Sequence, residues 1–218
     1  MKVVIFLVSM LYTSVFAFAQ PDFGADGLKG LSETQLRELK SGQIVITVGN
    51  LPTSGQTSDK ATAFIEAAMV MAKPPSEAWK YLYRTEDQYL YMRETESSTV
   101  LSRSLDQILI EYRVRVLLVE TSFRLFHHYD AANLSISWRL DPDYDNGLRE
   151  FKGFWYLYPF DGNKTLARYG NYVSLVGIPD FIVRFFIKNG INRSLASVRN
   201  YVESSGMYRK RSLRSDLY

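Results

Sequence analysis

The chain has 218 residues, of which 46% are hydrophobic and 14% aromatic, so it carries enough apolar surface to bury a core within one globular domain. This composition excludes disorder for most of the chain. The sequence contains no cysteine, which rules out disulfides, thiolate metal sites and a thiol nucleophile, and its net charge is only +3.

Residues 1–19 have the layout of a signal peptide. Lys2 precedes an apolar run from Val3 to Phe16, and Ala17 and Ala19 form a cleavage site of the A-x-A type. The run is short for a membrane span, which needs about 20 apolar residues. We therefore predict an exported protein, periplasmic in a bacterium and otherwise secreted. An uncleaved N-terminal anchor is the competing interpretation.

Residues 20–60 are predicted to form an extension of one helix, one strand and one loop. Ser32 and Gln35 have capping-box spacing, and Gly42 suits the end of the helix that they begin. The stretch "QIVITV" reads as a strand, and turn residues fill the polar loop that follows it. The segment from Ala61 to Ala72 then reads as a long strand of small and apolar residues.

Two short helices are predicted after this strand. Pro74 and Pro75 end the strand and favour a helix start, so "SEAWKYLYR" is predicted to be helical, with Trp79 in the core. A second short helix is predicted around "TEDQYLYM". The next stretch, "QILIEYRVRV", alternates cleanly between apolar and polar residues, as a half-buried strand does.

Further antiparallel strands follow in a meander. They are predicted within "ETSFRLFHHY", "NLSISWRL", "LREFKGFWYLY" and "KTLARYGNYVSLV", and Asp161-Gly162-Asn163 forms the turn between the last two. Aromatic side chains occupy both faces of the strand that contains Trp155. Gly153 and Gly170 are interpreted as bends where the sheet curls.

A long helix is predicted to close the domain. Pro179 and Asp180 begin it, and Asn189-Gly190 is expected to kink or split it before residue 204. Residues 205–218 form a basic tail, in which the last ten residues hold four basic and one acidic side chain. The rest of the domain is close to neutral, which argues against nucleic-acid binding. The tail either contacts an anionic membrane surface or is a solvated terminus.

The order of these elements resembles the START-like, or SRPBCC, helix-grip superfamily, which includes polyketide cyclases, coenzyme Q-binding proteins and lipid-transfer domains. The resemblance rests on "AKPPSEAWKYLYRTEDQYLYM", "ISWRLDP", "GFWYLYP" with "KTLARYG", and "GIPDFIVRFF". It implies an α+β fold in residues 61–204, with a curved antiparallel sheet of about seven strands wrapped around the C-terminal helix. It also implies a hydrophobic tunnel between sheet and helix.

The candidate ligand-binding residues are the side chains expected to face this tunnel. They are Tyr112, Trp138, Trp155, Tyr169, Asn171, Phe181 and Phe185. The competing interpretation is a solid core made of the same residues. A polar anchor for the ligand is expected from Arg168, Tyr169, Asn171 or a histidine. The partner is then a hydrophobic small molecule or lipid.

An enzyme is the main rival, but the usual catalytic motifs are missing. The two histidines, His127 and His128, are adjacent on a predicted strand, so they point to opposite faces and cannot hold one metal together. We assign no catalytic residue, no metal and no cofactor. A cyclase that shapes a bound polyketide-like substrate is the alternative, and a protein-interaction module is the third hypothesis.

Overall fold

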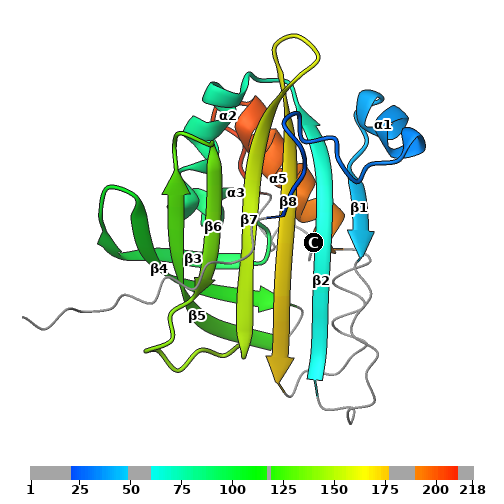
Figure 1. Ribbon diagram of the computed structural model, residues 1–218. Coiled ribbons are helices and arrows are strands. Elements are labelled where there is room, and N and C mark those ends of the chain that lie inside the picture. Colours follow the sequence, from blue (N-terminus) through cyan, green and yellow to red (C-terminus); the bar gives the residue numbers. More distant parts are fainter. Residues whose placement is uncertain (1–20, 49–59, 117–118, 177–189, 211–218) are drawn as a thin grey trace, which may run out of the picture.

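A computed structural model describes residues 21–48, 60–116, 119–176 and 190–210 (Figure 1). Among these residues, eight strands form one antiparallel sheet in the order β1-β2-β8-β7-β6-β5-β4-β3. The strands are β1 Val45–Val48, β2 Lys60–Met71, β3 Thr95–Arg103, β4 Gln107–Val116, β5 Val119–Asp130, β6 Ser135–Leu140, β7 Glu150–Phe160 and β8 Lys164–Val176. The helices are α1 Glu33–Lys40, α2 Pro75–Leu82, the 3₁₀ turn η1 Thr85–Asp87, α3 Gln88–Tyr91 and α5 Ile191–Glu203.

The predicted α+β, helix-grip architecture is confirmed. The capped helix α1 precedes β1, the two short helical segments follow β2, and the meander leads to a C-terminal helix. Helix α5 accounts for the second part of the predicted long helix. The first part, the position Asn189 and the candidate residues Phe181 and Phe185 lie outside the described residues, as does the predicted signal peptide.

The sequence reasoning missed one strand, β3, which raises the sheet from about seven strands to eight. Its sequence, "TESSTVLSR", is polar and lacks a clean alternation, because most of its side chains are exposed at the edge of the sheet. Its pairing with β4 shifts register twice, between Thr95 and Ser97 and between Val100 and Ser102. Such irregularities are common at sheet edges, where they disfavour pairing with another chain.

Helices α2, α3 and α5 lie together on one face of the curved sheet (Figure 1). We call this the inner face. Strand β4 shows how the sequence builds it, because Ile108, Ile110 and Tyr112 are buried on this face while Arg113 and Arg115 are exposed. The main core of the protein lies between this face and the helices, and it includes Leu195, which is 2% exposed on α5.

The outer face of β7 and β8 is covered by the N-terminal segment, residues 21–31, drawn in dark blue in Figure 1. The ring of Phe23 lies 5.8 Å from Phe154 and 6.1 Å from Tyr156. The Arg168 guanidinium stacks 3.9 Å from the Phe23 ring, and its Nη1 donates to the Gly27 carbonyl at 2.8 Å. This cover explains why aromatic residues occupy both faces of β7.

Gly153 and Gly170 provide space for aromatic rings on the paired strand. Trp138 is the partner of Gly153, and Phe154 is the partner of Gly170. A Cβ at Gly153 would lie 2.3 Å from the Trp138 ring, and one at Gly170 would lie 2.2 Å from the Phe154 ring. These glycines therefore allow one aromatic ring to lie flat against the sheet on each face.

Replacing Gly170 with alanine should lower the free energy of unfolding by about 1 to 3 kcal/mol, because the new methyl group overlaps a buried ring. Urea denaturation measures this loss. Gly162 lies in an open turn with nothing within 4 Å of its Cβ position, but its φ of +74° makes it unsuitable as a control. Ala132, which is exposed in the turn after β5, is a suitable site for a neutral Ala132→Ser control. An unchanged stability in Gly170→Ala would contradict this packing.

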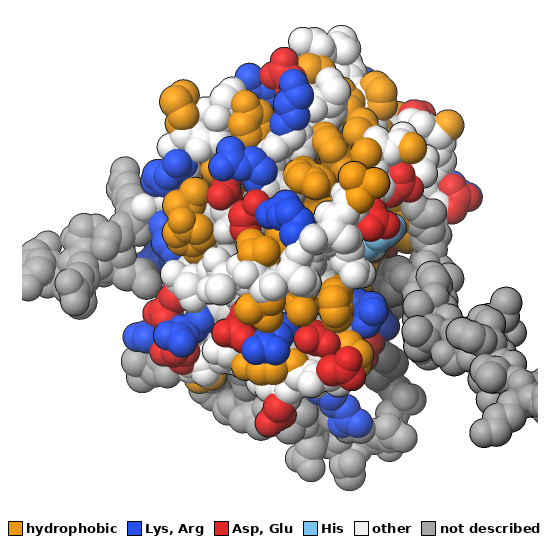
Figure 2. Space-filling model, turned by 90° about the vertical axis from the view of Figure 1, so that its left-hand side faces the viewer, with side chains coloured by type: hydrophobic (Ala, Val, Ile, Leu, Met, Phe, Trp, Pro, Cys, Tyr) orange, Lys and Arg blue, Asp and Glu red, His pale blue; other side chains and the backbone are white. Residues whose placement is uncertain are grey.

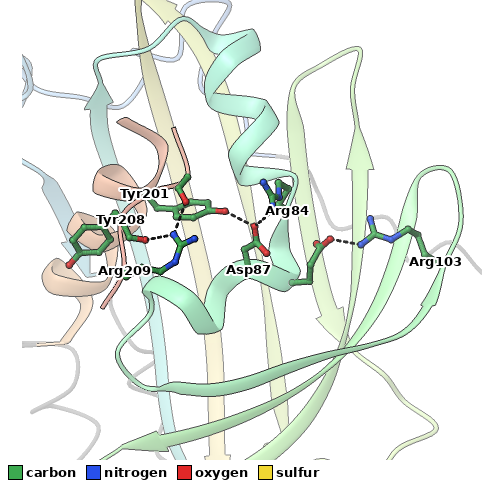
Figure 3. A network of polar contacts seen from close by, with 8 residues as sticks. Arg84, Asp87, Arg103, Tyr201, Tyr208 and Arg209 are labelled. Atoms are coloured by element: carbon green, nitrogen blue, oxygen red, sulfur yellow. Dashed lines mark hydrogen bonds and ion pairs between the residues drawn. The ribbon is translucent and has the colours of Figure 1, made fainter. Parts of the chain in front are cut away.

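A polar network fixes the end of α5 to η1 (Figure 3). The Tyr201 hydroxyl donates to Asp87 Oδ2 at 2.5 Å, and Arg84 forms an ion pair with the same oxygen at 2.8 Å. The Tyr201 ring also stacks on Tyr91, with 4.3 Å between ring centroids. Burial, together with the bond to Asp87, raises the pKa of Tyr201. Helix α5 is thereby held against the segment that closes one end of the inner face.

The described part of the expected tail, residues 205–210, packs against α3 and β3. The Lys210 backbone amide donates to the Leu90 carbonyl at 2.9 Å, and its Nζ contacts the carbonyls of Met92 and Thr95. Burial lowers the pKa of Lys210. On the side of the molecule shown in Figure 2, basic and acidic side chains are interspersed with hydrophobic ones.

Candidate ligand-binding cavity

A cavity of about 250 Å³ lies between the inner face of the sheet, α5 and the η1–α3 segment. Strands β4 to β8 supply most of its wall, and α5 supplies Ile191, Ser194, Leu195 and Val198. The core is therefore not packed solid at this place. The volume exceeds that of an engineered apolar cavity of about 150 Å³ that binds benzene.

The cavity has one deeply buried end and one less buried end. At the buried end, Tyr112, His127 and Ile136 are each at most 2% exposed. At the other end, Val116 and Val119 flank the β4–β5 connection, and both are partly exposed.

Three aromatic rings form a continuous wall on strands β6, β7 and β8. The Tyr169 ring lies 4.6 Å from Trp155 and 5.9 Å from Trp138, measured between ring centroids. All three residues border the cavity. Each lies at a position of its strand whose side chain points to the inner face, since side chains alternate between the two faces of a sheet. Such a wall offers a planar ligand a large contact area.

The buried end contains a hydrogen-bonded group of polar side chains. The Tyr112 hydroxyl contacts the Thr85 carbonyl at 3.2 Å and His127 Nε2 at 3.0 Å. The Thr85 hydroxyl lies 2.6 Å from the Tyr129 hydroxyl. His127 Nδ1 is buried and has no partner among the described residues. Burial lowers the pKa of His127 to about 3, so the ring is neutral at physiological pH.

The structure places five of the seven predicted site residues in the cavity wall: Tyr112, Trp138, Trp155, Tyr169 and Asn171. The other two lie outside the described residues. That these side chains bind a ligand stays a prediction. Arg168, named as a possible anchor, faces the other way and is buried under the N-terminal segment. His127 and His128 do point to opposite faces, since His127 is 2% exposed and His128 is exposed.

Sequence reasoning expected the C-terminal helix to line the cavity and named Phe181 and Phe185, but it did not name the helical residues that the structure places in the wall. Thr85 and Gln88 reach the cavity from η1 and α3, and Ser194 reaches it from α5. A small polar residue on a helix gives no sign that it borders a void. The apolar spacing of Ile191, Leu195 and Val198 is the signal that was available, because it defines one face of α5.

The described part of the chain holds no group of three or more metal-ligating side chains. Within the same residues, every helix is too short or too polar to cross a bilayer. The described lining of the cavity contains a single carboxylate, Glu94, and neither lysine nor arginine.

No model of a protein family matches the sequence, and no curated protein matches it. Solved structures do match. A STAR-related lipid transfer protein from Xanthomonas axonopodis is similar with a TM-score of 0.60 and 17% identity, over 73% of this chain and 93% of that one. The Zhui aromatase/cyclase from Streptomyces sp. R1128 is similar with a TM-score of 0.55 and 14% identity, over 67% of this chain and 94% of that one.

A START superfamily protein from Mycobacterium smegmatis is also similar, with a TM-score of 0.52 and 14% identity, over 67% of this chain and 99% of that one. A curved antiparallel sheet, a C-terminal helix across its inner face and a cavity between them define the helix-grip class of proteins. Within that class, this chain has the START-like, or SRPBCC, fold.

Proposed function

We propose that this protein is an exported START-like domain that binds, and carries, a hydrophobic small molecule in the cavity between the sheet and α5. The observation that carries the proposal is an unfilled, mostly apolar space of about 250 Å³ at the centre of the fold. An unfilled void lowers the stability of a protein. A cavity of this size therefore favours a ligand-binding function that offsets the cost. The lipid-transfer protein among the similar structures supports the same function.

Apolar contact alone would give weak binding. Burying about 300 Å² of ligand surface contributes roughly 7 kcal/mol. Association costs at least about 4 kcal/mol, so the difference corresponds to millimolar affinity. Tighter binding therefore requires polar contacts in addition to the aromatic wall.

The hydrogen bonding and the pKa of the one histidine in the described lining favour binding over catalysis. His127 is the only histidine in the described lining, and its Nε2 already contacts Tyr112. A general base needs a pKa near the working pH, whereas burial lowers the pKa of His127 to about 3. Cyclase activity is the alternative, since an aromatase/cyclase is among the similar structures.

Replacing Trp155 with alanine should weaken the binding of an apolar fluorescent probe by at least about tenfold, because a tryptophan ring of the aromatic wall is lost. The matched control is Trp79→Ala. Trp79 packs against the same core from α2 but does not border the cavity.

Probe titration and urea denaturation of both variants separate binding from stability. We expect Trp79→Ala to lower stability while its folded fraction binds the probe within about twofold of wild type. Equal loss of binding in both variants, or unchanged binding in Trp155→Ala, would show that the probe does not occupy this cavity.

A further inference from the structure

Two polar side chains on β8 face the cavity next to the aromatic wall. Tyr169 and Asn171 are two residues apart on one strand, so their Cα atoms are about 7 Å apart and both side chains point inward. Both border the cavity, and their outward neighbours Gly170 and Tyr172 do not. Each group can therefore reach a ligand that lies against the wall.

A long hydrogen bond from Trp138 orients the Asn171 amide. The indole Nε1–H donates to Asn171 Oδ1 at 3.4 Å. An indole nitrogen can only donate, so the amide must turn its oxygen towards Trp138. The Asn171 NH₂ group is left with no partner among the described residues. It presents hydrogen-bond donors to the cavity.

The Tyr169 hydroxyl has no hydrogen-bond partner among the described residues either. Burial raises the pKa of Tyr169, so the phenol keeps its proton and can donate it. A ligand oxygen that accepts from this hydroxyl would give it a partner inside the cavity.

The charge of the lining determines what kind of acceptor fits. The described lining contains no lysine or arginine, and its one carboxylate, Glu94, disfavours an anion. A charged carboxylate or phosphate would be buried there without a counter-charge, which is costly. A neutral carbonyl oxygen meets the same donors without that cost.

We propose that the ligand is a planar, largely apolar molecule that carries a neutral carbonyl group, and that the Asn171 amide, positioned by Trp138, donates to that carbonyl together with the Tyr169 hydroxyl. This inference rests on the proposed function and names the chemical class of the ligand. The ring system lies against Trp155 and Tyr169, and the carbonyl points at β8.

The probes for the test are 1-tetralone and tetralin, which share a bicyclic frame and differ in one carbonyl. Calorimetric titration of the wild-type protein and of Asn171→Leu gives the ratio of the two affinities for each protein. We expect Asn171→Leu to reduce the preference for 1-tetralone about tenfold and to leave the affinity for tetralin within about twofold. Trp138→Phe, which frees the amide, should reduce the preference by a smaller factor.

Infrared spectroscopy of 1-tetralone bound to the wild-type protein provides a measurement that needs no variant. The carbonyl stretch should lie at a lower frequency than in an apolar solvent, because hydrogen bonding weakens the C=O bond. This inference alone would be overturned if both probes bind, the carbonyl stretch does not shift, and Asn171→Leu leaves the ratio of the affinities for 1-tetralone and tetralin unchanged. Failure of both probes to bind the wild-type protein would overturn the proposed function as well.

Discussion

Replacing Ser194 with tryptophan should abolish ligand binding while the protein stays folded. Ser194 lies on α5, is 7% exposed and borders the cavity, so a large side chain at this position extends into the existing space. Overpacking a filled core costs about 1 to 3 kcal/mol, and a void lowers that cost. We therefore expect affinity for 1-tetralone to fall at least about a hundredfold with a small change in stability.

The neighbouring residue Arg193 supplies a matched control. It lies on the same turn of α5 but is exposed, so Arg193→Trp adds the same side chain on the side away from the cavity. Titration calorimetry should show wild-type affinity in Arg193→Trp. A folded Ser194→Trp variant that still binds 1-tetralone with wild-type affinity would show that the ligand lies elsewhere.

Lowering the pH should destabilise the protein through His127, in addition to its general acid sensitivity. Burial lowers the pKa of His127 from 6.5 to about 3 in the folded state, whereas the unfolded chain titrates near 6.5. Between these two values the unfolded state holds one proton more, so stability falls as the pH falls through this window. Above about pH 7.5 His127 is neutral in both states and does not change the free energy of unfolding. On going to pH 5, protonation of His127 in the unfolded chain lowers the free energy of unfolding by about 2 kcal/mol.

The contribution of His127 can be isolated by comparison with two variants. His127→Phe removes the buried imidazole and leaves Tyr112 its bond to the Thr85 carbonyl, and His128→Phe removes the exposed histidine instead. Urea denaturation at pH 7.5 and pH 5 should show about 2 kcal/mol less acid destabilisation in His127→Phe than in wild type, and no such difference in His128→Phe. Equal pH dependence in all three proteins would mean that His127 is protonated in the folded state.

The sequence predicted a strand or helix correctly wherever apolar side chains recur with the period of that element. The alternation in β4 identified the inner face correctly, from Ile108 to Tyr112, and the Asp161-Gly162 turn was found because both residues suit left-handed backbone. Strand β3 was not predicted, because an edge strand needs no buried face and its polar sequence shows no alternation of apolar and polar residues. An element without a buried face is therefore visible only where a cap or a turn marks it, as Ser32 and Gln35 mark α1.

The candidate site was predictable in part for the same reason. Tyr112, Trp138 and Trp155 were expected to point inward, and the structure shows all three at the cavity. The role of Arg168 was not predictable, because its partners are carbonyls of residues 27 and 29, about 140 positions away in the sequence. The residues alone left a void and a solid core both open, since the difference depends on how far α5 stands from the sheet; the tunnel was expected only from the resemblance to the START-like superfamily.

The most direct test of the cavity is to ask which molecules the protein retains. Wild type and Ser194→Trp are incubated with an apolar extract of the cells that produce the protein, purified again, and extracted for mass spectrometry. Retention of one class of neutral, carbonyl-bearing apolar molecules by wild type alone is the predicted result. Identical molecules on both proteins, or none on either, would contradict the claim that the space beneath α5 holds a ligand.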